Sequence, residues 1–130
     1  MNVSRLELVE LIEGAAAKLS PEGRELAERM ELLAEVPPPG DEGAVYRTQR
    51  AQADEVLDLP AHDQDLIDRL LLLWAGLAES DEAERQGKDG TPRRNMAVIV
   101  AAGSKDRREG RQIDPYMTPE QAVARLREPG

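Results

Sequence analysis

Two pairs of carboxylate residues stand three positions apart in segments with the apolar periodicity of helices. Glu28 and Glu31 form the first pair, and Asp65 and Asp68 form the second. Residues three apart lie on the same side of an α-helix, close enough for both carboxylates to bind one divalent ion. Two facing helices that each carry such a pair would form an oxygen cage for Mg²⁺. These four residues are therefore the candidate metal ligands of the sequence.

The two pairs occur within LAERMELLAEV and DQDLIDRLLLLWAGLA. In these segments the sequence resembles the all-α nucleoside triphosphate pyrophosphohydrolases, whose signature is E-x-x-E on one helix and E-x-x-D on a following helix. Asp65 stands where the signature has Glu, and Glu55 with Asp58 supplies a literal E-x-x-D at closer spacing. The resemblance implies Mg²⁺-dependent release of pyrophosphate from a nucleoside triphosphate, with the metal held by the four carboxylates Glu28, Glu31, Asp65 and Asp68.

The helical pattern around Glu28 favours a second interpretation of the same residues. Leu26, Met30 and Leu33 recur at i, i+4 and i+7, which places the apolar stripe opposite Glu28 and Glu31. Side chains opposite the buried stripe of an amphipathic helix face solvent. This arrangement favours a solvated acidic surface. We therefore expect a non-catalytic protein without a cofactor, and Mg²⁺-dependent hydrolysis is the alternative.

Residues 91–112 are basic, whereas the whole chain has a net charge of −9. Six basic side chains stand there against two acidic ones, a balance of +4, while residues 1–90 carry −12. Such a segment could bind an anion, either a nucleotide phosphate or an acidic protein surface, because Arg pairs bidentately with both. It could also neutralise the acidic helices of its own chain. A further interpretation is that it meets the acidic helices of a second subunit, in a head-to-tail or twofold assembly.

Composition excludes several classes of site. The chain has no Cys and one His, so it cannot form a disulfide, a thiolate nucleophile or a zinc-finger site. The negative charge repels a nucleic-acid backbone, and no aromatic residue lies within 91–112 to stack on a base, so we expect no nucleic-acid partner. The first residues lack the features of a secretion signal, and the longest apolar run, Leu70–Ala78, is too short to cross a membrane. We expect a cytoplasmic protein without a membrane-spanning segment.

Capping signals place the helices that must position these residues. Ser4 and Glu7 form a capping box at the start of a first helix. Ser20 and Pro21 start a second helix, which three consecutive prolines end. Thr118 starts a last short helix.

The middle of the chain is less regular. A weak helical pattern covers 42–57. Residues 91–103 favour a helix, although the apolar run 96–102 also fits a short buried strand. Polar residues, Gly and Pro gather in three segments where we expect loops, at about 36–42, 79–91 and 104–116.

The segment Pro60–Ala78 has the widest apolar pattern and is expected to be the central helix. Two neighbouring stripes of large apolar residues run along it: Leu66, Leu70, Leu73 and Leu77, and beside them Ile67, Leu71, Trp74 and Ala78. Leu72 falls outside both stripes, on the side of Asp65 and Asp68. Its position fits either a larger core or a surface that binds a partner.

These patterns predict a compact all-α bundle of four or five helices around a central Leu-rich helix, in a single domain covering residues 1–130. We expect the protein to act through protein–protein contacts. It would be a structural adaptor, an inhibitor whose acidic helices mimic nucleic-acid phosphate, or an assembly subunit of a homo-oligomer. The predicted partner-binding residues are Leu72, Arg93, Arg94, Lys105, Arg107, Arg108 and Arg111.

Overall fold

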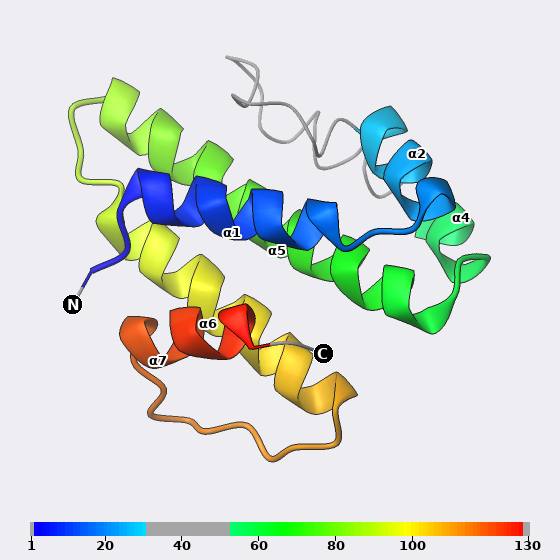
Figure 1. The fold of residues 1–130 in the computed structure, drawn as a ribbon. Helices are drawn as coiled ribbons and strands as arrows, with labels where there is room; N and C mark the ends of the chain where they lie inside the picture. The colour runs from blue at the N-terminus through cyan, green and yellow to red at the C-terminus, as the bar shows by residue number, and fades with distance from the viewer. Residues whose placement is uncertain (1, 31–52, 129–130) are drawn as a thin grey trace.

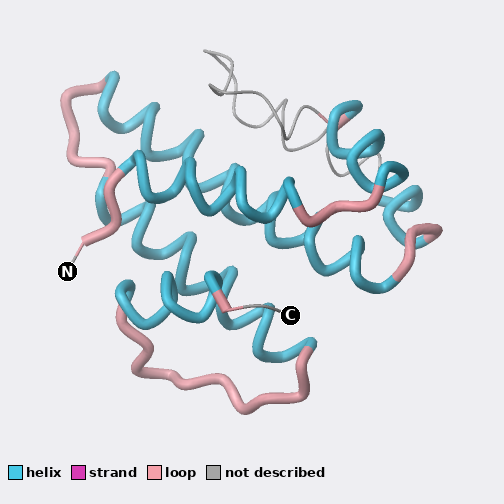
Figure 2. Tube along the Cα trace, in the orientation of Figure 1, coloured by secondary structure: helices cyan, strands magenta, loops and turns pink. Residues whose placement is uncertain are grey.

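Six α-helices and no strand form in the described part of the computed structural model, which covers residues 2–30 and 53–128. They are α1 (Arg5–Ala17), α2 (Pro21–Arg29), α4 (Ala53–Leu57), α5 (Ala61–Arg85), α6 (Thr91–Arg108) and α7 (Pro119–Arg127), as Figures 1 and 2 show. The predicted all-α fold is confirmed, and residues 96–102 are helical within α6. The described residues form one helix more than the four or five expected, and α7 is the predicted last short helix. The loop predicted at 36–42 and most of the helix predicted at 42–57 lie outside the described residues.

The predicted start signals cap three of these helices. At the start of α1 the Glu7 amide donates to Ser4 Oγ at 3.1 Å and the Ser4 amide donates to Glu7 Oε1 at 3.3 Å. Ser20 Oγ accepts from the Gly23 amide at 3.2 Å at the start of α2. Thr118 forms a second capping box, before α7. Each cap satisfies amides that the first turn of a helix leaves without a partner.

The 25-residue helix α5 is the centre of the fold and contacts α1, α2, α4 and α6. Figure 1 shows α1 lying against α5, with α6 returning from the end of α5. Leu66, Leu70, Leu73 and Leu77 are all buried, as the stripe pattern predicts, and Trp74 is buried beside them.

Helix α5 is longer than its apolar pattern indicates and ends at Arg85. The prediction of a loop at 79–91 is therefore wrong for residues 79–85. Ser80 and Ala83 are buried within this polar stretch, and the Ser80 hydroxyl donates to the Leu77 carbonyl at 3.0 Å. This stretch is also held to α1 by the ion pair of Arg5 with Asp81, at 2.9 Å, so it packs as part of the helix. The chain then turns at Gly87, whose φ of 77° favours Gly.

Helices α5 and α6 approach closely at Gly76 and Ala97. A Cβ atom on Gly76 would overlap the Cβ atom of Ala97, so the approach requires Gly. Helix α6 also continues beyond the predicted end at Gly103, and the loop predicted at 104–116 is helical as far as Arg108. It continues because Lys105 and Asp106 are buried among partners of opposite charge.

Helix α7 packs mainly against α6 and also contacts α1. It buries Ala122, Val123 and Leu126, the three residues that the sequence assigns to its apolar face. None of the described helices is both long enough and apolar enough to cross a membrane.

Candidate partner-binding face on α6

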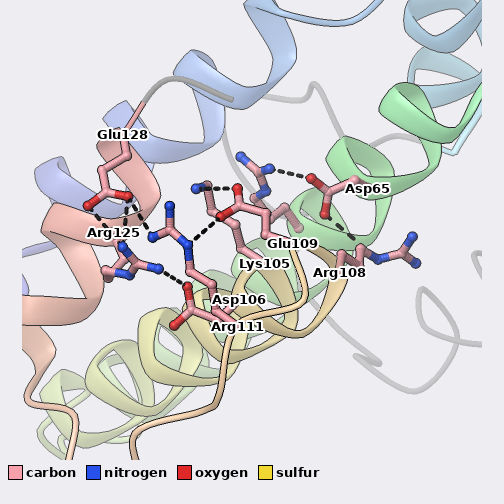
Figure 3. Close-up of polar contacts among 9 residues, drawn as sticks. Asp65, Lys105, Asp106, Arg108, Glu109, Arg111, Arg125 and Glu128 are labelled. Atoms are coloured by element: carbon pink, nitrogen blue, oxygen red, sulfur yellow. Dashed lines mark hydrogen bonds and ion pairs between the residues drawn. The ribbon is translucent and has the colours of Figure 1, made fainter.

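Asp65 and Asp68 lie on one side of α5, as their spacing predicts, but their neighbours are cations. Arg108 of α6 forms an ion pair with Asp68 and approaches Asp65 Oδ1 with its Nε at 3.7 Å. Asp65 also accepts a hydrogen bond from the buried Arg69. Burial raises the pKa of Asp68, and the Arg108 charge opposes this rise. Two guanidinium groups therefore already compensate the charge of this carboxylate pair, as Figure 3 shows for Asp65 and Arg108.

The other predicted metal ligands lie apart from this pair. Glu28 is exposed on α2 and forms a long ion pair with Arg24, at 3.6 Å. Glu31 lies outside the described residues. Glu55, of the alternative E-x-x-D, pairs with Arg29 at 2.8 Å. Across residues 2–30 and 53–128, no group of three or more His, Asp or Glu side chains is arranged to hold a metal ion.

Two of the six basic residues predicted to bind a partner are buried. Arg94 donates from Nε to the Val3 carbonyl at 2.9 Å, from Nη1 to Glu84 at 2.7 Å and from Nη2 to Thr91 at 3.0 Å. It thereby ties the N-terminal segment to the α5–α6 connection. Lys105 is 1% exposed and donates to Glu109 at 2.7 Å. Lys105 thus pairs within the last turn of α6, and both side chains are buried.

Arg108 and Arg111 pair with acidic groups of their own chain. Arg111 reaches Glu109 at 3.5 Å and Glu128 at 3.4 Å. Figure 3 shows these contacts within a cluster of charged side chains that joins the end of α6 to α7. For these two residues, the structure matches the interpretation that the basic segment neutralises the chain's own acidic groups.

The same cluster shifts two pKa values. The hydrogen bond from Lys105 lowers the pKa of Glu109, because it stabilises the carboxylate. Arg125 donates to the buried Asp106, and this hydrogen bond raises the pKa of Arg125. Both shifts favour the ionised forms, the carboxylate of Glu109 and the guanidinium of Arg125.

Arg93 and Arg107 differ from the other four basic residues. Both are exposed, and neither forms an ion pair with any of the described residues. Met96 and Val100 lie between them in sequence, and the side chains of these two residues are 60% and 43% exposed. Spacings of three, four and seven residues place all four on one side of the helix. We call Arg93, Met96, Val100 and Arg107 the outer face of α6.

An exposed loop residue extends this face. Gly103 lies on the same side of α6, and Ile113 Cγ2 would lie 3.8 Å from a Cβ atom at that position. Ile113 is itself 36% exposed. The apolar surface between the two arginines therefore continues from α6 onto the loop that follows.

Leu72 lies elsewhere. It is half-buried and packs against the core, and so belongs to the larger core that the sequence left open. The sequence left residues 96–102 open between a helix and a short buried strand, and it did not identify Met96 and Val100 as exposed. Residues 96–102 contain more large apolar side chains than one buried side of a helix can accommodate. This excess was the available signal that some of them are exposed.

Comparison of the chain with models of protein families, with curated proteins and with solved structures found no match.

Proposed function

We propose that this protein is a non-catalytic binding protein, and that the outer face of α6 holds an acidic segment of a partner protein. One observation carries the proposal: two large apolar side chains are exposed on one side of α6 between two arginines without described ion-pair partners. Adaptors, inhibitors and assembly subunits all act through surfaces of this kind.

The chemistry of the face defines the partner. Met is enriched in protein interfaces, where its flexible side chain fills irregular gaps. Arg pairs bidentately with carboxylates and is a frequent source of binding energy. Arg93 and Arg107 are separated by 14 positions, or roughly 21 Å along a helix. The expected partner segment therefore has an apolar centre with Asp or Glu near each end.

Charge supports a partner that is acidic only locally. The rest of this chain is strongly acidic, with −12 over residues 1–90. A uniformly acidic protein would be repelled by those helices. A segment that places its carboxylates on Arg93 and Arg107 gains attraction at the face itself, and like charges elsewhere disfavour other orientations.

The test is an equilibrium binding measurement with the full chain and a partner isolated from the native host. Charge reversal in Arg93→Glu or Arg107→Glu should weaken binding by about tenfold or more, and Met96→Asp should do the same. Lys88→Glu is the matched control, because it makes the same charge change in the exposed connection between α5 and α6. Equal losses in Lys88→Glu and Arg93→Glu would contradict the proposal.

A second copy of this chain is one possible source of the acidic segment. Sedimentation at low and high salt distinguishes the sources. A monomer at both salt concentrations is expected for a different partner protein. An oligomer that dissociates with salt, and that Arg93→Glu abolishes, would instead identify the chain's own acidic helices as the occupant.

A further inference from the structure

A cavity of about 270 Å³ lies between α1, α5 and α7, away from the outer face of α6. Its apolar wall comes from all three helices and consists of Leu11, Ala15, Leu73 and Leu126. Ligand sites are mostly apolar, with a few polar groups that fix orientation. At roughly 30 Å³ for each water-sized group, the space holds a molecule of about ten non-hydrogen atoms.

The charged lining of this cavity is mainly cationic. Lys18, Arg69 and Arg127 line it, against the single carboxylate of Glu10. Glu10 and Arg127 are only loosely paired, at 3.8 Å, and both are exposed. In a chain with a net charge of −9, three cations around one small cavity are a local reversal of charge.

Arg69 is the buried member of this group, with 2% of its surface exposed. It donates from Nη2 to Asp65, but its Nε is buried without a hydrogen-bond partner among the described residues. A buried guanidinium N–H without an acceptor costs free energy, and such groups in folded proteins are rare. Arg69 lines the cavity, so a ligand carboxylate there would lie near a buried guanidinium that pairs only with Asp65 among the described residues.

Gly14 offers a position at which the cavity can be tested. It lies inside α1 and lines the cavity, yet a Cβ atom at this position would have no neighbouring heavy atom within 4 Å. Gly in the interior of a helix destabilises it relative to Ala. Gly14 is exposed beside the cavity, and a long side chain at position 14 could occupy the space.

We propose that this cavity binds a small monocarboxylate with an apolar body. The carboxylate lies against Lys18, Arg69 and Arg127, and the hydrocarbon or aromatic part packs against the leucines. Octanoate and phenylacetate have the size and the chemistry that the cavity accepts.

The test is a titration of the full chain with octanoate, followed by the backbone amide resonances of Ala15, Leu73 and Leu126. Saturable shifts are expected. 1-Octanol, which has the same chain length without the charge, should bind at least about tenfold more weakly. Lys18→Gln should weaken octanoate binding by about tenfold, while Lys88→Gln, the same charge change outside the cavity, leaves it unchanged.

Gly14→Leu separates loss of binding from loss of the fold. Leu is the better helix former, so the variant should melt at the same temperature as the wild type or higher, and it should no longer bind octanoate. Any one of three results would overturn the proposal: no saturable shift, equal binding of octanoate and 1-octanol, or undiminished octanoate binding by folded Gly14→Leu.

Discussion

Arg108 on α6 forms an ion pair with Asp68 on α5, although the two residues are 40 positions apart in the sequence. The same guanidinium approaches Asp65, so a cation already occupies the place where the paired carboxylates would hold a metal. A metal ion would have to displace Arg108 and would then repel it. This relationship favours the binding function over Mg²⁺-dependent hydrolysis.

We predict that millimolar Mg²⁺ leaves the melting temperature of the protein unchanged relative to NaCl at equal ionic strength. A ligand that binds only the native state raises its stability with concentration, so a bound ion would be visible in this comparison. Incubation with a panel of nucleoside triphosphates and Mg²⁺ should release no pyrophosphate. If Mg²⁺ stabilises the protein saturably and Asp65→Asn removes this stabilisation, the Mg²⁺-dependent hydrolase interpretation would be supported instead.

Glu109→Gln tests the charged cluster at the end of α6 through its pH dependence. The pKa of Glu109 is lowered in the folded protein by the hydrogen bond from Lys105. The native state therefore favours the carboxylate, and the stabilisation is complete above the unfolded pKa, near 4.3. It is lost as the pH falls through the lower, native pKa.

Urea unfolding should accordingly show wild type more stable than Glu109→Gln near neutral pH, with the difference shrinking as the pH falls towards 3. Gln keeps the size and hydrogen-bonding oxygen of the protonated acid, so the two proteins converge. Glu13→Gln, at an exposed position of α1, serves as control and should change the free energy of unfolding by less than about 0.5 kcal/mol. A constant difference between wild type and Glu109→Gln at every pH would rule out this role of the carboxylate.

Two Gly→Ala substitutions should have opposite effects. Gly76→Ala places a methyl group into Ala97 at the α5–α6 contact and should destabilise the protein by about 1–3 kcal/mol. Gly14→Ala meets no neighbour and should stabilise it by about 0.5–1 kcal/mol through helix propensity. Thermal or urea unfolding measures both. Equal effects would mean that α5 and α6 do not approach as closely as described.

Asp63 should be needed for the junction between α1, α2 and α5. It is buried, accepts from the Ser20 amide at 3.0 Å and also accepts from the Ser20 hydroxyl. Asp63→Ala leaves these donors without their acceptor and should destabilise the protein by about 2 kcal/mol. Asp58→Ala, at an exposed position, should change stability by less than about 0.5 kcal/mol. Equal effects of the two substitutions would show that this junction does not depend on Asp63.

Local patterns predicted much of the fold. The capping boxes at Ser4 and Thr118 depend only on residues three positions away, and the leucine stripe of α5 depends only on helical periodicity. The ends of α5 and α6 could not be found in this way. Ser80 and Lys105 are polar in sequence, yet both are buried inside a helix, which local periodicity does not indicate.

The candidate site was predictable only in outline. The sequence located a basic segment, but six similar side chains divide into three roles once the fold is known. Arg94 is buried and donates a hydrogen bond to the Val3 carbonyl, Arg108 forms an ion pair with Asp68, and Arg93 is exposed. Residues distant in sequence decide each outcome. Periodicity alone therefore could not identify which cations face a partner.

Photo-crosslinking from position 96 tests the central claim most directly. A photoreactive residue replacing Met96 in the full chain, expressed in the native host, should yield a discrete covalent adduct whose partner peptide contains Asp or Glu beside apolar residues. Leu6 is a matched position, 67% exposed on α1, and should yield no such adduct. The added Arg93→Glu change should remove the adduct at position 96. Equal crosslinking from positions 6 and 96, or an adduct that survives Arg93→Glu, would contradict the assignment of the outer face of α6 as the partner-binding surface.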